Sequence, residues 1–528
     1  ICGPSEYESS FAWDAADNTI FRPISRFFAV DPAGPSVNVN SMDEVPNSSW
    51  FVNRLGTGAL SQDDIVRGYC DEKVLDPEHD KPGSWVIDQG KANGANPGFR
   101  VNVEGAGRFM LKSDPTDQPE RATGADAIAT RFYYASGWWV PCVNVVYVKP
   151  ELLKLKPGLK VTDNSGVTKD FDQKALDEIL AKGSHRNGLV RMEASRWLPG
   201  RTIGPFTYAG TKWDDPNDVI PHEDRRDLRG ARVIAAWLNH FDSREQNSMQ
   251  TWMPDEKNPE VGHVQHWYID LGDCFGSEWE WEGLSKRLGH AYSLDVPYVA
   301  EDFITLGFIT RPWDRARRSR DGEIFGFFSA RDFDPDMWRG GYPNPTFNRM
   351  DEADAAWATR IISRFTLEDV EAIVAKGDYT EAKHTNFLVG QLLLRQEAIL
   401  KRYFAKLSPI ADLKVTGTQL CGTDLAKKTG TYFAEEFHYR ARMFSGVELE
   451  NARPLVTPAV TDNGNVCASL VHIAPDGGIP DDSPERYVVV DIENGKSKGP
   501  LRAHLYDLGP KNGFRLAGVE RPDTVKPD

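Results

Sequence analysis

The chain has 528 residues, of which 40% are hydrophobic and 11% aromatic, and its formal net charge is −16. This apolar content excludes a chain that is disordered throughout, and the length predicts roughly two to four domains. The acidic balance argues against general nucleic-acid binding, which needs a basic surface to displace counterions from the phosphate backbone. No stretch reaches the ~20 apolar residues that a membrane-spanning helix requires.

Residues 1–95 are irregular and rich in Pro, Asn, Ser and Asp. Their aromatic side chains include Phe27, Phe28, Trp50 and Phe51, which need burial. We therefore expect an extended N-terminal arm that packs on the core of the protein.

The six cysteines and the first residue give information on the cellular compartment of the protein. No two cysteines form a CxxC pair, so a zinc ribbon is not expected, whereas Cys421 and Cys467 lie in one strand-rich region and could form a disulfide. The chain starts at Ile1 rather than Met. Together these features favour an exported protein, periplasmic, extracellular or on the cell surface, and leave a cytoplasmic location open.

The pattern becomes strand-like at residue 99. Apolar and polar side chains alternate over residues 99–103, which is typical of a half-buried strand. A turn at Gly105-Ala106-Gly107 leads into a returning strand that ends at Lys112. We expect a hairpin with Lys112 near the end of its second strand.

A helix and two strands follow this hairpin. Apolar residues at i, i+3, i+4 and i+7 predict a helix that begins near Ala125 and closes at Gly137, so that Asp126 falls near its start. An apolar, β-branched run at 138–148 predicts a buried strand, and a further strand ends at Glu193.

The next part of the chain is mainly helical. An apolar stripe predicts a helix over 228–238, which leads into a polar loop and then a hairpin that ends near residue 268. Later helices are expected at about 351–364, 367–376 and 384–405. Thr366 and Asp369 predict a capping box at the start of the second of these helices. From about residue 410, short strands separated by Gly, Asn and Asp turns predict a β-rich C-terminal module.

The polar loop carries the residues with the clearest chemistry. Asp242 is followed five residues later by Asn247, and Asp270-Leu271-Gly272 comes directly after an apolar strand. Phosphoryl transfer requires a positioned acceptor hydroxyl, a held phosphate chain and metal ions that take up charge. An Asp that accepts the hydroxyl proton, with an Asn and an Asp that bind magnesium, would supply most of this.

These spacings resemble the motifs of protein kinases. Asp242 and Asn247 match the D-x-x-x-x-N of the catalytic loop, and Asp270-Leu271-Gly272 looks like the metal-binding D-F-G. Lys112 on a strand and Asp126 in the next helix follow the kinase order of the ATP-binding lysine and its acid. The details are similar to atypical bacterial kinase-like families, the HipA-like and spore-coat CotH-like kinases, and cover about residues 98–405.

The resemblance implies an α+β chain with a two-lobed protein-kinase-like core. The N-terminal arm would span residues 1–95, the N-lobe 96–195, the C-lobe 196–409 and the β-rich C-terminal module 410–528. The implied activity is ATP- and Mg²⁺-dependent phosphoryl transfer to an unspecified protein or small-molecule acceptor.

The resemblance also implies a role for each site residue. Lys112 would hold the α- and β-phosphates and Asp126 would orient it. Asp242 would act as base or orient the acceptor. Asn247 and Asp270 would bind the metal, with Asp273 as a second candidate ligand. Glu193 would lie at the hinge, where backbone groups meet adenine, with its side chain incidental.

Several departures from the kinase pattern keep other functions open. Asp126 is one methylene shorter than Glu, so its ion pair with Lys112 is expected to be long or water-mediated. The glycine turn at 105–107 is not a full G-x-G-x-x-G, and no A-P-E follows Asp270, while Arg244 would replace a missing positive charge near the γ-phosphate. The alternatives are a non-catalytic, pseudokinase-like scaffold on the same fold, or nucleotidyl transfer.

A run of basic residues lies outside these motifs, at Arg311, Arg315, Arg317, Arg318 and Arg320. It is either the solvated face of a loop or a docking site for a phosphate or an acidic substrate.

Overall fold

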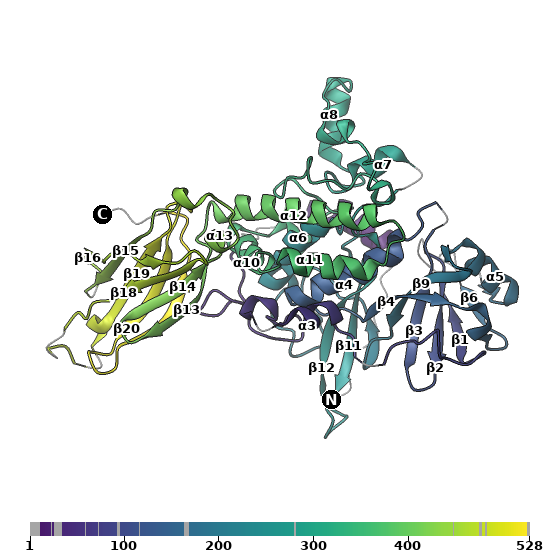
Figure 1. The fold of residues 1–528 in the computed structure, drawn as a ribbon, viewed down its shortest axis with the longest axis horizontal. Coiled ribbons are helices and arrows are strands. Elements are labelled where there is room, and N and C mark those ends of the chain that lie inside the picture. Colours follow the sequence, from purple (N-terminus) through teal and green to yellow (C-terminus); the bar gives the residue numbers. More distant parts are fainter. Residues whose placement is uncertain are drawn as a thin grey trace.

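The computed structural model describes residues 11–22, 24–25, 34–58, 60–71, 73–91, 96–115, 117–162, 168–278, 281–446, 448–474, 478–480 and 483–524. The chain is an α+β protein, and Figure 1 shows a sheet at one end, a helical body in the middle and a β-rich module at the other end. Phe27 and Phe28, which were expected to pack on the core, lie outside the described residues.

The sheet has seven strands, in the order β4-β9-β3-β2-β1-β5, with β8 paired to β9. The strands are β1 (Trp85–Gly90), β2 (Gly98–Val103), β3 (Gly107–Lys112), β4 (Val143–Val148), β5 (Leu153–Leu155), β8 (His185–Arg186) and β9 (Leu189–Arg196). Helix α5 (Gln173–Lys182) packs Leu176 and Leu180 into the core of this sheet, beside the ribbon of β6 (Lys160–Thr162) and β7 (Thr168–Asp170). Because β1 belongs to the sheet, the stretch expected to be an arm, 1–95, contributes a strand from residue 85 onward.

Two element boundaries differ from the prediction, each for a local reason. The strand expected over 138–148 begins only at Val143, because Pro141 has no N–H to donate to a ladder. Helix α4 (Arg121–Ser136) begins before the predicted Ala125, so Asp126 lies in its second turn. The first turn of α4, Arg121-Ala122-Thr123-Gly124, has no large apolar side chain, and periodicity therefore does not detect it.

Helix α4 connects the sheet to the helical body. Its Ile128 and Phe132 belong to the large core shared with the helices that follow, and α4 also contacts β4 and β9. The body comprises α3 (Gln62–Arg67), α6 (Arg226–Leu238), α9 (Pro345–Asn348), α10 (Glu352–Ile362), α11 (Leu367–Val374) and α12 (Ala382–Phe404). The capping box at Thr366 and Asp369 is confirmed.

Three further features surround the helical body. Strands β10 (Arg201–Gly204), β11 (Ser248–Pro254) and β12 (Gly262–Tyr268) form a small antiparallel sheet. Helix α1 (Phe11–Ala16) lies near the N-terminus of the chain. Helices α7 (Glu282–Arg287) and α8 (Val296–Thr305) stand out from the body at the top of Figure 1.

The C-terminal module consists of two sheets that share one apolar core. The first contains β13 (Ile410–Thr416), β14 (Gln419–Asp424), β17 (Ala459–Val460) and β18 (Asn465–Ser469), with the short helix α13 (Leu425–Lys428) after β14. The second contains β15 (Arg440–Ser445), β16 (Asn451–Pro454), β19 (Tyr487–Glu493), β20 (Leu501–Asp507) and β21 (Phe514–Glu520).

Two disulfides are present. Cys421 and Cys467 are cross-strand partners on β14 and β18 and form the disulfide that the sequence indicated. Cys70–Cys142 was not foreseen, and it joins the N-terminal segment to the start of β4. Disulfides of this kind persist in an oxidising environment. Among the helices of the described ranges, none is both long enough and apolar enough to cross a membrane.

Asp43 in the N-terminal segment is an electrostatic junction. Its carboxylate pairs with Arg226 of α6, Arg360 of α10 and Arg521 beyond β21. Burial alone would raise the pKa of Asp43, but the three guanidinium groups hold it well below its usual range. The N–H of Val519 also donates to the carbonyl of Ser41, so the N-terminal segment, the helical body and the C-terminal module meet at this point.

Asp43→Asn tests this junction. Asn keeps the shape of the side chain and tolerates the positive φ of 59° at this position, but it leaves three arginines without their shared anion. We expect a loss of about 3 kcal/mol in the free energy of unfolding, measured with urea. Asp462→Asn, at an exposed turn position, is the matched control and should have almost no effect. Equal losses in both variants would show that the junction does not stabilise the fold.

Candidate functional site

Lys112, at the end of β3, is surrounded by three carboxylates. Its Nζ lies 2.6 Å from Glu193 Oε1, 2.7 Å from Asp270 Oδ1 and 3.5 Å from Asp126 Oδ2. Burial alone would lower the pKa of Lys112, but the three acids raise it well above its ordinary value. Lys112 is therefore a permanent cation at the boundary between the sheet and the helical body.

The register of the sheet brings Glu193 to Lys112. β3 and β9 are antiparallel neighbours, and Lys112 and Glu193 are direct cross-strand partners. Glu193 also pairs with Val145 of β4, so it sits inside the sheet and not at a hinge with free backbone groups. The prediction that its side chain is incidental was wrong, because that side chain is fully buried against Lys112.

Asp126 approaches the same lysine from α4. Its separation of 3.5 Å from Lys112 is longer than that of Glu193, and both acids are buried. Burial raises the pKa of Asp126. Burial and the negative charge of Asp126 together raise the pKa of Glu193 well above its usual range. Lys112 thus compensates two carboxylates that could not remain charged alone in this environment.

Asp270 is the member of this group that reaches solvent. It follows β12 with a φ of 57°, a left-handed conformation that Asp tolerates better than most residues. Its side chain keeps 42% exposure, and chiefly the Lys112 ammonium holds its pKa well below the usual range. Arg121 of α4 supports the following turn by donating to the carbonyls of Gly272 and Gly276. Asp270 is therefore an ionised carboxylate that faces outward from a buried ion cluster.

The loop after α6 carries Asp242 and Asn247. The Nδ2 of Asn247 donates to both the backbone carbonyl and Oδ2 of Asp242, each at 2.8 Å. The Ile269 N–H donates to the Asn247 carbonyl, which holds this loop beside the residue before Asp270. His240 points into the core, where its Nδ1 lies 2.8 Å from the Tyr133 hydroxyl. The structure therefore brings the loop and the end of β12 together.

Asp242 has an unusual protonation equilibrium. Burial raises its pKa to about 7, Arg244 at 3.1 Å opposes that shift, and the negative charges of Asp273 and Asp270 add to it. Arg244 thus lies in the charged loop as expected, and its Nε contacts Oδ1 of Asp242. A carboxylate with a pKa near 7 can accept or release a proton at neutral pH.

The glycine turn at 105–107 cannot contact a ligand held by Lys112. Lys112 pairs with Gly98 and the turn lies at the other end of the same hairpin, about 17 Å away by strand rise. The connection at the Lys112 end is the one between β1 and β2. Gly98 is required there, because a Cβ would come within 2.2 Å of the Leu111 carbonyl.

Sequence reasoning missed Lys91, which belongs to the same charged group. It follows β1, and its Nζ donates to the Asn96 carbonyl at 3.0 Å. Burial and the Lys112 charge lower its pKa, while Asp270 and Glu193 oppose that shift. In the sequence, a lysine beside the glycines at 90 and 94 was the only indication that Lys91 belongs to the site. The register of β1 and β2 was needed to place this lysine near Lys112.

The oxygen atoms at the mouth of the site suit a hard cation. The negative charges of Asp273 and Asp270 help to raise the pKa of Asp242, and Asn247 can offer its Oδ1 as a metal ligand because its Nδ2 faces Asp242. Magnesium prefers carboxylate and amide oxygens, and a bound divalent cation would lower the pKa of Asp242, which burial chiefly and the charges of Asp273 and Asp270 in part have raised. In the described part of the chain, no three His, Cys, Asp or Glu side chains are already gathered around one point as metal ligands.

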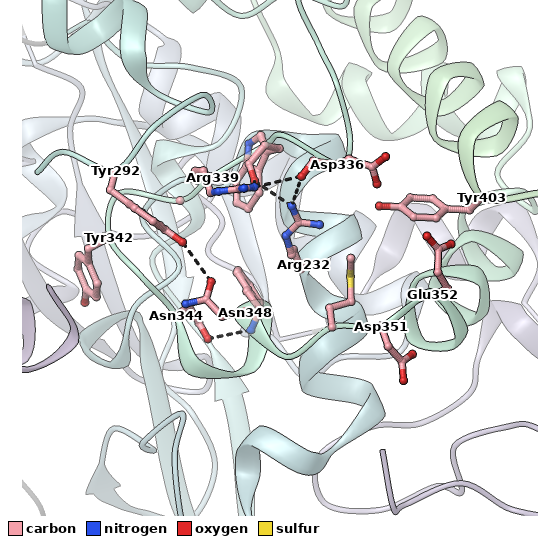
Figure 2. Close-up of a pocket in the computed structure, with 14 residues that line it drawn as sticks. Arg232, Tyr292, Asp336, Arg339, Tyr342, Asn344, Asn348, Asp351, Glu352 and Tyr403 are labelled. Atoms are coloured by element: carbon pink, nitrogen blue, oxygen red, sulfur yellow. Dashed lines mark hydrogen bonds between the residues drawn. The ribbon is translucent and has the colours of Figure 1, made fainter. Parts of the chain in front are cut away.

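A separate pocket of about 760 Å³ is lined by residues of α6, α9, α10 and the end of α12 (Figure 2). Arg232 of α6 and Arg339 approach each other there, and Tyr292 donates to Asn348. Its wall is joined to the loop, because the Gly341 N–H donates to the Phe241 carbonyl at 2.6 Å. None of the predicted site residues is among the side chains that line this pocket.

Comparisons with protein-family models, with curated proteins and with solved structures found no match to this chain.

Lys112→Met tests the charge balance of the site. The substitution keeps the length of the side chain but leaves Glu193 and Asp126 buried without a cation, so we expect a loss of about 3–5 kcal/mol in the free energy of unfolding at pH 8. The raised pKa of Glu193 lets it take up a proton as the pH falls, so the deficit should shrink by pH 5.5.

Lys174→Met, at an exposed position on α5, is the matched control. Urea unfolding of both variants at the two pH values provides the measurement. A deficit in Lys112→Met that does not depend on pH would contradict the assignment of buried carboxylates that depend on Lys112.

Proposed function

We propose that this protein is an ATP- and Mg²⁺-dependent phosphotransferase with a two-lobed, kinase-like core. The observation that carries the proposal is the convergence of Lys112, Asp126 and Asp270, which lie far apart in the sequence but meet at one ion cluster. The adjoining loop presents Asp242 and Asn247 as a hydrogen-bonded pair. A nucleotide-binding site requires a fixed cation and nearby oxygen ligands of this kind.

The arrangement of the chain supports a core of two lobes. A largely antiparallel sheet carries Lys112, helix α4 supplies Asp126, and a helical body follows after β9. The residues proposed to bind metal lie on the helical side, at the end of α6 and after β12. A nucleotide bound between the sheet and the helical body would therefore meet both sets of residues.

Each side chain has a role in this proposal. Lys112 binds the phosphate chain, and Glu193 and Asp126 hold it in place as a buried cation. Asp270 and Asn247 hold magnesium, which neutralises phosphate charge when bound. Asp242 accepts the proton of the acceptor hydroxyl or orients it, because its pKa of about 7 suits proton transfer at neutral pH.

The two disulfides support an exported location for this activity. The acceptor in that compartment would be a protein or a small molecule with a free hydroxyl group.

A second candidate is a scaffold without phosphoryl transfer. It is favoured by the Lys112–Asp270 contact of 2.7 Å, in which the proposed phosphate-binding and metal-binding groups neutralise each other. A protein of this kind would bind its partner without ATP, so nucleotide binding separates the two candidates.

Calorimetry with ATP tests the site directly. We expect ATP to bind the wild type in the presence of Mg²⁺ and to bind at least about tenfold more weakly to Asp270→Ala, because the cation loses its ionised ligand. Asp462→Ala, at an exposed position in the C-terminal module, should bind like the wild type. Absence of ATP binding by the wild type would refute the proposed activity and favour the scaffold.

Asp242→Asn tests the chemical step. The Asn side chain can still accept the hydrogen bond from Asn247 but cannot take a proton, so ATP turnover should fall about 10²–10⁴-fold while ATP binding persists. In the wild type, kcat/KM for ADP release should increase with pH through about 7, because Asp242 must lose its proton to act as a base. A flat profile, or full turnover by the variant, would refute the role of Asp242.

A further inference from the structure

Helix α8 and the residues after it form an exposed apolar tip. The side chains of Phe303, Ile304, Leu306 and Phe308 are 82%, 79%, 82% and 86% exposed, and Val296 and Val299 on the same helix are more than half exposed. No residue of α8 is buried. Contiguous apolar surface of this kind marks a site of contact with a membrane or another molecule.

An ordinary amphipathic surface helix packs its apolar face on the protein, whereas α8 packs its polar face. The return segment packs on its polar side, where Arg311 pairs with Glu301 at 2.7 Å and Asp302 at 2.6 Å. Arg311 also lies over the Tyr298 ring, and Trp313 makes an edge contact with that ring at 5.3 Å. Residues 298, 301, 302 and 305 share this face at helical spacing, whereas 296, 299, 303 and 304 face outward. The fold therefore uses the polar face for packing and presents the apolar face to solvent.

Basic residues follow the tip in the chain, on the segment that returns from it to the helical body, in the run of arginines at 311–320. Between residues 311 and 320 there are five arginines and a single acid, Asp314, although the whole chain carries a net charge of −16. Arg315, Arg317 and Arg320 are exposed, and none of the three forms an ion pair with another described residue. Arg311 and Arg318 are already paired with acids. Positive charge without an ion-pair partner that follows exposed Phe, Leu and Ile in the chain is typical of segments that bind the interface of an anionic membrane.

We propose that α8 and the arginines after it bind an anionic lipid surface. The apolar side chains around Gly307 would enter the boundary between headgroups and acyl chains, and Arg315, Arg317 and Arg320 would contact the lipid phosphates. The shape supports a bilayer over a protein partner, because the segment projects from the body as a convex tip (Figure 1). A bilayer accepts a convex tip directly, whereas a protein partner must supply a groove of matching shape. The inference is independent of the nucleotide site, which lies on other elements of the chain.

Flotation with lipid vesicles tests the proposal on the full-length chain. We expect the wild type to float with vesicles that contain phosphatidylglycerol and to remain largely unbound with pure phosphatidylcholine. Phe303→Gln combined with Phe308→Gln should lower the partition coefficient at least about tenfold, because each Phe loses most of its apolar transfer free energy. The triple change of Arg315, Arg317 and Arg320 to Gln should weaken binding to anionic vesicles by at least about tenfold, with a further loss in high salt.

Trp213→Gln is the matched control, since Trp213 is 87% exposed but lies outside the tip. It should float like the wild type, and all variants should keep the wild-type unfolding temperature because the substituted side chains are exposed. The proposal is overturned if the wild type fails to float with anionic vesicles, or if the double Phe variant floats equally well. It is also overturned if the tip variants instead abolish self-association in sedimentation velocity, which would make the tip a contact between copies of the chain.

Discussion

The buried ammonium of Lys112 is the interaction on which the rest of the site depends. Three carboxylates from a neighbouring strand, a helix and a turn meet a single cation, and two of the three are shielded from water. Desolvated charges are tolerated only when their partners are held in place, so β3, β9, α4 and the end of β12 must dock together. The ion cluster thus couples the sheet to the helical body. Glu193 and Asp126 are buried within the cluster, and Asp270 is the acid that faces outward.

The structure also explains which parts of the site could be read from residue spacing. Lys112 at the end of a strand, Asp126 on the next helix and the loop of Asp242 and Asn247 were all foreseen, because each depends on a local pattern. The contact of Glu193 with Lys112 depends on the register between β3 and β9, which are separated by the helix and strands between them. A one-residue shift in that register would turn Glu193 to the other face of the sheet, and no local sequence pattern specifies the register.

The same division holds for the fold. The long helices α10, α11 and α12 follow their apolar stripes, and the Cys421–Cys467 pair lies within one strand-rich region. Cys70 and Cys142 are separated by 72 residues, and no local pattern in the sequence brings them together. The glycine turn at 105–107 lies where the sequence placed it, between β2 and β3, and the register of this hairpin puts it at the end opposite Lys112.

The Asp43 junction has a consequence for the order in which the protein is completed. Asp43 and Arg521 are 478 positions apart, so the carboxylate emerges from the ribosome long before its last partner has been synthesised. Until then the N-terminal segment can find Arg226 and Arg360 but not the C-terminal module, whose strand β21 also supplies the Val519 hydrogen bond. Contacts between such distant positions close late and slowly, because a long loop must be ordered first. The docking of the C-terminal module therefore follows the synthesis of Arg521, and a chain that lacks Arg521 would leave the junction incomplete.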